Sequence, residues 1–206
     1  MGYTRVIIRC ALPLFLFCAA SWAQVIDFES GGLKYKALTR SGVTVIFTVL
    51  PTPVREYAVM QVAVSNGAAV SWTVKPDDFS FQTTGQGSGQ TVRALPAGTV
   101  VGELLQKAGR RDVIRLVAAY EASLFNNAQI HSTNGYESRR QNAFAEFGSS
   151  KLKAAAAASA IAMASTKLAP GQSTDGAVFF PHQGKALGAG TLTVKTAGEV
   201  FTFPVE

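Results

Sequence analysis

The stretch LAPGQSTDGAVFFP, residues 168–181, decides the fold, because turn-forming residues are followed at once by a short apolar run. Pro170-Gly171 favours a turn, Asp175-Gly176 is expected to end it, and residues 177–180 are expected to enter a core strand. Nothing in the stretch is positioned as a nucleophile or a ligand cluster. It therefore predicts a structural role in a sheet.

Short runs rich in β-branched and aromatic residues lie on both sides of a middle segment. In the run 57–65, Ala58, Met60, Val62 and Val64 alternate with the other residues and form the expected core face. The last two runs have the pattern of a hairpin. Trp72 is expected to be a large core residue. About seven such strands predict a two-sheet β-sandwich; the runs are 43–50, 57–65, 71–74, 79–82, 176–180, 191–195 and 199–205.

The first 23 residues have the pattern of a secretory signal peptide. Arg5 and Arg9 precede the apolar run CALPLFLFCAA, and Ser21-Trp22-Ala23 places small residues at the positions that signal peptidase reads. We expect cleavage between Ala23 and Gln24, leaving residues 24–206 as one domain, exported to the periplasm or secreted.

Two alternatives for this segment are weaker. A retained membrane helix needs about 20 apolar residues, and the run is shorter and contains Pro13. A lipid anchor on Cys18 would require a small residue where Phe17 stands. Both cysteines of the chain, Cys10 and Cys18, lie in the segment, so the mature protein has no disulfide and its stability must come from a core.

The middle of the chain differs from its flanks in charge and in the spacing of its apolar residues. Residues 91–167 carry ten basic and five acidic residues, whereas the basic and acidic residues nearly balance on either side. Residues 99–108 suggest a short helix, and from Asp112 apolar residues recur with the spacing of an amphipathic helix. A capping pattern at Ser138 suggests another helix, which can continue into the alanine tract. We therefore predict a helical insertion at about 97–167.

The alanine tract between Lys153 and Lys167 does not predict a membrane span. Its 13 residues would form a helix of roughly 20 Å, shorter than the roughly 30 Å hydrocarbon core. Alanine favours helix and allows close backbone approach, so we expect the tract to pack against the sandwich or a partner helix. Contact with another subunit or a membrane surface is the alternative.

The order of VSN at 64–66, KPDDFSF at 75–81, LAPGQSTDGAVFFP at 168–181 and a closing hairpin resembles the extracellular immunoglobulin-like domains of unknown function found in bacterial exported proteins. Those domains have an L-x-P-G-x-S-x-x-G-x-V-F-F element that enters a core strand. The resemblance spans residues 33–82 and 168–205, about half of the mature chain, and implies an immunoglobulin-like fold without catalytic residues. The helical insertion departs from the pattern.

The sequence matches the motifs of known enzymes only in part. The Ser150–Lys153, Ser132–Asn134 and Lys195–Ala197 segments approach the motifs of penicillin-recognising enzymes, but their order is wrong and the last glycine is missing. His131 and His182 have no metal-ligating residues at a suitable spacing. We therefore expect no cofactor, no metal and no catalytic site.

The most suggestive feature for function is a basic cluster of five arginines in this middle segment. It can meet an acidic protein or an anionic envelope surface, and export makes nucleic acid an unexpected partner. The alternative is a solvated helix face paired with Glu121 and Glu137. Two function classes remain: a structural or protein-interaction module of the cell envelope, and an enzyme with an unrecognised site in the groove between insertion and sandwich. The residues of the cluster are Arg110, Arg111, Arg115, Arg139 and Arg140.

Overall fold

The computed structural model of the chain describes residues 24–84, 89–107 and 159–206, together with residues 114, 115, 117, 118, 120–122 and 139. Within these ranges the protein is mainly β, and the strands of every sheet pair in antiparallel fashion. This confirms the mainly β, antiparallel fold predicted from the sequence. The proposed signal peptide lies outside the described residues, and Gln24, the expected first residue of the mature chain, is exposed.

The first sheet has five strands in the order β1-β2-β3-β4-β9. Its strands are β1 (Ile26–Ser30), β2 (Leu33–Arg40), β3 (Val43–Val49), β4 (Tyr57–Asn66) and β9 (Ser173–Pro181).

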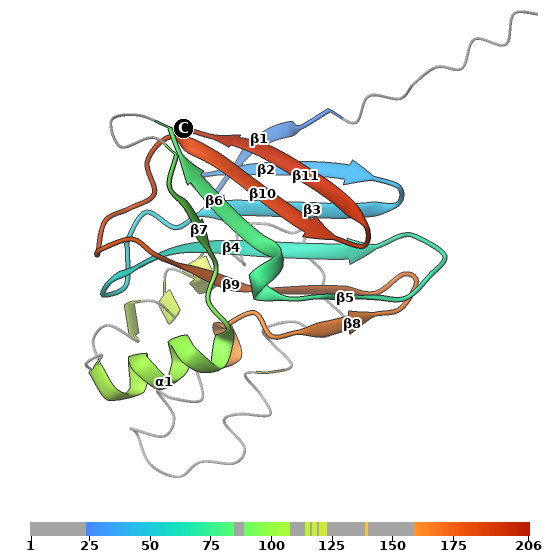
Figure 1. Cartoon of the computed structure of the whole chain (residues 1–206). Coiled ribbons are helices and arrows are strands. Elements are labelled where there is room, and N and C mark those ends of the chain that lie inside the picture. The colour runs from blue at the N-terminus through green and yellow to red at the C-terminus, as the bar shows by residue number, and fades with distance from the viewer. Residues whose placement is uncertain are drawn as a thin grey trace, which may run out of the picture.

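The second sheet has four strands in the order β11-β10-β6-β7 and lies across the first (Figure 1). Its strands are β6 (Phe79–Thr83), β7 (Thr91–Arg93), β10 (Gly190–Thr196) and β11 (Glu199–Val205). Thus strands from the beginning and the end of the chain share each sheet.

Three shorter elements complete the described chain. A two-stranded ribbon of β5 (Trp72–Val74) and β8 (Thr166–Leu168) extends at one end of the sheets, and a single 3-10 turn (Pro76–Asp78) follows β5. Helix α1 (Ala97–Lys107) lies below β9 in Figure 1. The predicted insertion at 97–167 therefore ends in a strand, since residues 166 and 167 pair with β5.

One core holds the two large sheets together. Met60 and Val62 of β4 lie in the same buried cluster as Phe81, Leu192 and Phe203 of the second sheet. The rings of Phe47 and Phe203 meet edge to face with centroids 5.0 Å apart. The alternation predicted for β4 is confirmed, because Ala58, Met60, Val62 and Val64 all lie in this cluster. Trp72 is half-buried and packs against it.

The opposite face of the first sheet is buried as well. Tyr57 and Val59 of β4 and Phe179 of β9 form a second apolar cluster with Val100 and Leu104 of α1. Tyr120 and the segment Ala160–Ala162 belong to the same cluster. We call α1, the helical residues around Tyr120 and the segment Ala160–Ala162 the helical layer. This layer covers the face, so β4 is buried on both sides.

The hairpin prediction is confirmed, because β10 and β11 pair from Gly190 and Val205 to Thr196 and Glu199. The prediction that Asp175-Gly176 ends the turn before the strand is wrong. These residues lie within β9, where Asp175 pairs with Ala63 and Gly176 with Val62, instead of ending a turn. The strand starts earlier because the turn is complete at Gly171, where φ is 80° and the backbone N–H donates to the carbonyl of Asn66.

Residues 154–158 of the alanine tract lie outside the described residues. Its described part, from residue 159, packs closely against β9, but the last residues are not helical. Residues 159–161 are helical, Ala162 forms a parallel bridge with Ala177 of β9, and β8 begins at Thr166. A Cβ placed on Gly176 would stand 2.6 Å from the Cα of Met163. Glycine in β9 and small residues in the tract thus permit direct backbone contact.

Candidate functional site

The described members of the predicted basic cluster occupy different environments. Arg115 is exposed on a helical segment, beside Ile114, whose side chain is 53% exposed. Arg139 is half-buried. Arg110, Arg111 and Arg140 lie outside the described residues, so the cluster as a whole stays a prediction.

Arg139 is tied to the interior. Its Nε donates to the carbonyl of Ala160 at 2.9 Å, and its Nη2 donates to the carbonyl of Asp175 at 2.8 Å. Guanidinium groups suit such multiple bonds because their donors are fixed in a planar fork. In the structure this side chain joins the helical layer to the sheet.

Three parts of the chain cover the outer edge of β9. The carbonyls of Asp175, Ala177 and Phe179 accept hydrogen bonds from the Arg139 side chain, from the backbone N–H of Met163 and from the backbone N–H of Leu95, respectively. An uncovered sheet edge would invite pairing with another chain. Leu95 just before α1, Met163 just after the segment Ala160–Ala162, and Arg139 therefore protect this edge.

A polar group without a partner lies under the same layer. Gln61 is 1% exposed in the middle of β4, opposite Ala177. Among the described parts of the chain, neither Nε2 nor Oε1 of its amide has a hydrogen-bond partner. A buried unpaired amide destabilises the folded state and requires an explanation.

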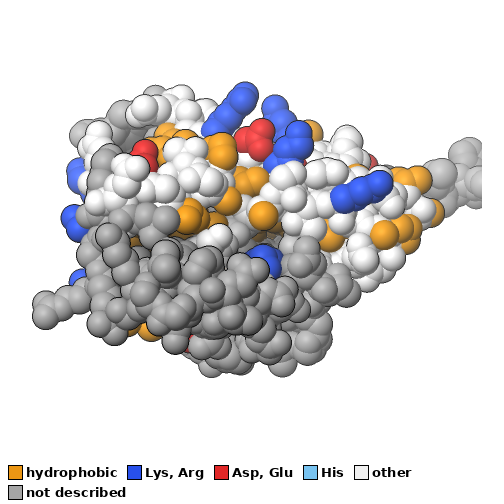
Figure 2. All heavy atoms as spheres, turned by 90° about the horizontal axis from the view of Figure 1, so that it is seen from below, with side chains coloured by type: hydrophobic (Ala, Val, Ile, Leu, Met, Phe, Trp, Pro, Cys, Tyr) orange, Lys and Arg blue, Asp and Glu red, His pale blue; other side chains and the backbone are white. Residues whose placement is uncertain are grey.

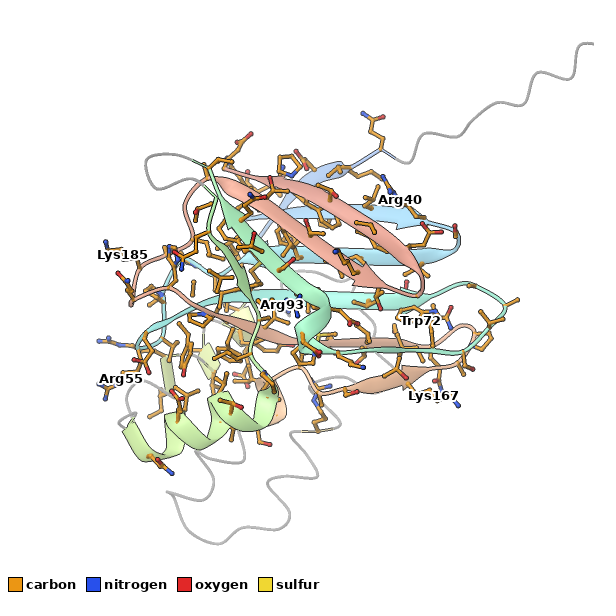
Figure 3. All side chains as sticks on the ribbon, viewed as in Figure 1. Arg40, Arg55, Trp72, Arg93, Lys167 and Lys185 are labelled. Atoms are coloured by element: carbon orange, nitrogen blue, oxygen red, sulfur yellow. The ribbon has the colours of Figure 1, made fainter. Side chains whose placement is uncertain are left out.

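An open groove separates α1 from the end of the first sheet. Its volume is about 410 Å³, and three parts of the chain line it: the start of β4, α1 and the loop after β9. This loop lies at the end of the molecule that carries Arg55 and Lys185, opposite the end that carries Trp72 and Lys167 (Figure 3). The lining residues are Arg55, Glu56, Tyr57, Glu103, Leu104, Gln183 and Gly184.

A phenol and a carboxylate meet in the groove. The hydroxyl of Tyr57, whose side chain is 3% exposed, donates to Oε2 of Glu103 on α1. Burial, this hydrogen bond and the negative charges of Glu103 and Glu56 raise the pKa of Tyr57 well above its ordinary value. At neutral pH the phenol is therefore a fixed hydrogen-bond donor, and the carboxylate faces it as an acceptor.

Two loops are held together at the rim of this groove. The backbone N–H of His182 donates to the carbonyl of Glu56 at 2.8 Å, and a Cβ on Gly184 would stand 2.9 Å from the carbonyl oxygen of Arg55. Arg55 and Gln183 have positive φ angles of 54° and 52°, which residues other than glycine seldom adopt. These contacts fix the position of the rim.

A second hollow, of about 590 Å³, lies beside the β1–β2 hairpin and the end of β11. The rings of Phe28 and Tyr35 stack there with centroids 5.2 Å apart, and Lys36 forms a 2.9 Å ion pair with Asp27. Tyr35 is 1% exposed, and burial raises the pKa of its phenol. This hollow is larger than the groove beside α1.

Comparison of the chain with family models, curated proteins and solved structures gives no match. In the part of the chain that the structure describes, no helix is long and apolar enough to cross a membrane. The same residues contain no group of three or more His, Cys, Asp or Glu side chains arranged to hold a metal ion.

The sequence predicted a groove between insertion and sandwich only as the place of an alternative enzyme site, and it identified none of the residues that line the groove. It did not identify the unpaired amide either. The groove joins Tyr57 to Glu103, 46 positions later, and no short motif encodes such a pair. One signal was present for Gln61: it is a polar residue in the middle of an otherwise apolar run.

Proposed function

We propose that the protein is an exported, immunoglobulin-like β-sandwich module of the cell envelope or the extracellular space, and that it acts by binding a protein partner. The single observation that carries this proposal is the exposure of Ile114 beside Arg115 on the helical layer. Exposed apolar and arginine side chains together are typical of binding surfaces.

The attachment of this layer to the sheet supports the same proposal. On the same helical segment, Tyr120 is fully buried and donates to Asp175, so the segment is held at one face while Ile114 and Arg115 remain outside. Seen from below the molecule of Figure 1, the coloured part of the surface exposes more basic than acidic side chains, with hydrophobic side chains between them (Figure 2).

Export is part of the proposal and has its own test. The whole chain, carrying a C-terminal tag, would be expressed in a bacterial host and recovered from the periplasm and the medium. Mass spectrometry of the mature protein is expected to find Gln24 as its first residue. Recovery of an uncleaved protein from the cytoplasm would contradict export.

The binding test compares variants of the exported protein in pull-downs from envelope extracts. Arg115→Glu and Ile114→Ser are expected to reduce capture of a specific partner by about ten-fold, as expected for interface residues that contribute more than about 1 kcal/mol. Lys195→Glu is the matched control, because Lys195 is exposed on β10 of the second sheet.

Loss of the partner with Arg115→Glu and Ile114→Ser, but not with Lys195→Glu, would support the proposed surface. Unchanged capture by all three variants, or no specific partner at all, would contradict it. Deletion of the whole helical layer is a poor test because it would expose Tyr57, Val59 and Phe179 to water.

A further inference from the structure

We propose that the outer edge of β1 accepts an added antiparallel strand from another protein, an extended segment in which basic residues alternate with apolar ones. β1 is the outermost strand of the first sheet, and among the described strands it pairs with β2 alone (Figure 1). An outer strand directs the backbone N–H and C=O groups of every second residue away from its neighbour, where another strand can pair with them. The inference concerns a surface other than that around Ile114 and Arg115 and does not rest on the proposed function.

The outer strands β7, β9 and β11 are each short or already covered. Three carbonyls along the outer edge of β9 accept hydrogen bonds from other parts of the chain. At β11 the carbonyl of Val200 accepts a 2.7 Å bond from Nη1 of Arg40, and Pro204 has no N–H to donate. β7 has three residues. Within the described parts of the chain, no backbone hydrogen bond from outside the sheet reaches residues 26–29 of β1, so this edge stays open.

The side chains of β1 alternate between apolar and acidic. Ile26, which is 62% exposed, and Phe28, which is half-buried, lie on one face. Asp27 and Glu29 lie on the other face, and both are exposed. Side chains that stand directly opposite each other on paired strands interact. An added strand would therefore extend both rows, with apolar residues beside Ile26 and Phe28 and charged residues beside the acids.

The pairing with β2 indicates which charge suits the acidic row. Lys36 and Lys34 of β2 lie directly opposite Asp27 and Glu29, and Lys36 forms a 2.9 Å ion pair with Asp27. Unlike charges in this position stabilise strand pairing, and like charges destabilise it. A carboxylate offers about four acceptor positions, so the bond from Lys36 leaves acceptor positions on Asp27 for a second cation. Lysine or arginine therefore suits the added strand.

The hollow of about 590 Å³ beside the β1–β2 hairpin gives such side chains room. Asp27, Lys36 and Phe47 share one face of the sheet, because the first two are paired residues and Phe47 pairs with Lys36 from β3. Phe47 and Val49 line the hollow together with Asp27 and Glu29. The alkyl stem of a lysine or arginine can pack on these apolar residues while its charged end reaches an acid.

A second copy of the chain fits this edge poorly. Residues directly opposite each other in an antiparallel pair have side chains on the same face. Because both acids lie on one face of β1, two β1 strands would place acids opposite acids, for example Asp27 opposite Glu29 of the second copy. Such pairs destabilise the pairing. The charge pattern therefore favours a different chain.

The first experiment titrates the exported protein with three short peptides, blocked at both ends, and follows binding by NMR. In the first peptide lysine alternates with valine; in the second, glutamate replaces lysine; in the third, proline replaces the central valine of the first. We expect the lysine peptide to bind about ten-fold more tightly than the glutamate peptide because of the opposed charges. The proline peptide should bind more weakly than the lysine peptide, since it lacks a backbone donor.

Hydrogen exchange and a variant locate the site. The lysine peptide is expected to slow amide exchange in residues 26–29, because pairing protects backbone N–H groups from solvent. Glu29→Lys should shift the preference toward the glutamate peptide. Asp77→Lys, which changes an exposed acid of the 3-10 turn, should leave the preference intact.

Four results would overturn the proposal: no binding of the lysine peptide, equal binding of the lysine and glutamate peptides, unchanged exchange in residues 26–29, or an unchanged preference in folded Glu29→Lys. A dimer of the protein alone with these amides protected would assign the edge to a second copy and overturn the choice of partner. Should Glu29→Lys fail to fold, the peptide comparison and the exchange on the unaltered protein still decide.

Discussion

The hydroxyl of Tyr120 donates a 2.6 Å hydrogen bond to Oδ2 of Asp175, which lies 55 positions later in the chain. Both side chains are buried, at 0% and 1% exposure. A carboxylate removed from water needs such donors. The bond therefore fastens the helical layer to the middle of β9, beside the Arg139 guanidinium that holds the backbone carbonyl of the same aspartate.

Removal of this hydrogen bond is expected to destabilise the protein. Tyr120→Phe keeps the ring and leaves the Asp175 carboxylate without this donor, so the free energy of unfolding should fall by about 1.5–3 kcal/mol. Urea unfolding measures the change. The double variant Tyr120→Phe with Asp175→Asn should lose less than the sum of the single variants, because the two side chains interact. Fully additive losses would contradict the bond.

Replacement of the unpaired amide is expected to stabilise the protein. Gln61→Met keeps an unbranched side chain of similar size and removes two buried polar atoms without partners. The free energy of unfolding should rise by about 1–3 kcal/mol, the usual cost of burying an unsatisfied group. Chemical denaturation tests this, and a loss of stability instead would show that the amide has a partner.

Two glycine variants are expected to change stability in opposite directions. Gly176→Ala would place its Cβ 2.6 Å from the Met163 Cα, so the backbone must shift, and the loss should be about 1–3 kcal/mol. Gly102→Ala lies within α1 with nothing within 4 Å of the new Cβ, and should stabilise the helix by about 1 kcal/mol. Thermal unfolding of both variants checks the prediction, which two shifts of the same sign would contradict.

Alkaline pH is expected to destabilise the protein through Tyr57. Its pKa in the folded protein is raised above the ordinary value of 10.0. Above pH 10.0 the unfolded chain therefore releases a proton that the folded protein retains, and the free energy of unfolding falls as the pH rises.

Denaturant unfolding at a series of pH values from neutral to alkaline measures this slope, and phenolate absorbance reports the ionisation. Tyr57→Phe should make the slope shallower. Burial raises the pKa of Tyr35 as well, so part of the slope should remain in this variant. An unchanged slope in Tyr57→Phe would contradict the assignment.

The sequence was sufficient to predict the strands whose apolar alternation depends only on neighbouring residues. The hairpin of β10 and β11 follows from two short apolar alternations and a tight turn, and its inward residues Leu192, Phe201 and Phe203 are fully buried. The core face of β4 was also predicted correctly. In both cases neighbouring residues determine which side chains share a face.

Other parts could not be predicted from local pattern. β1, β2, β7 and β8 were not among the expected strands. Tyr57, Val59 and Gln61 were placed opposite the core, yet the helical layer buries them too. A sequence pattern reports which residues alternate, and it does not report what covers each face.

What the sequence alone determined is the mainly β, antiparallel architecture, because backbone geometry imposes a two-residue alternation on apolar residues in a half-buried strand. Only the tertiary structure decided the Tyr120–Asp175 bond, the bonds of Arg139 to Ala160 and Asp175, and the groove that Tyr57 and Glu103 line. Each of these joins residues far apart in the chain, and their proximity results from the packing of one layer on another.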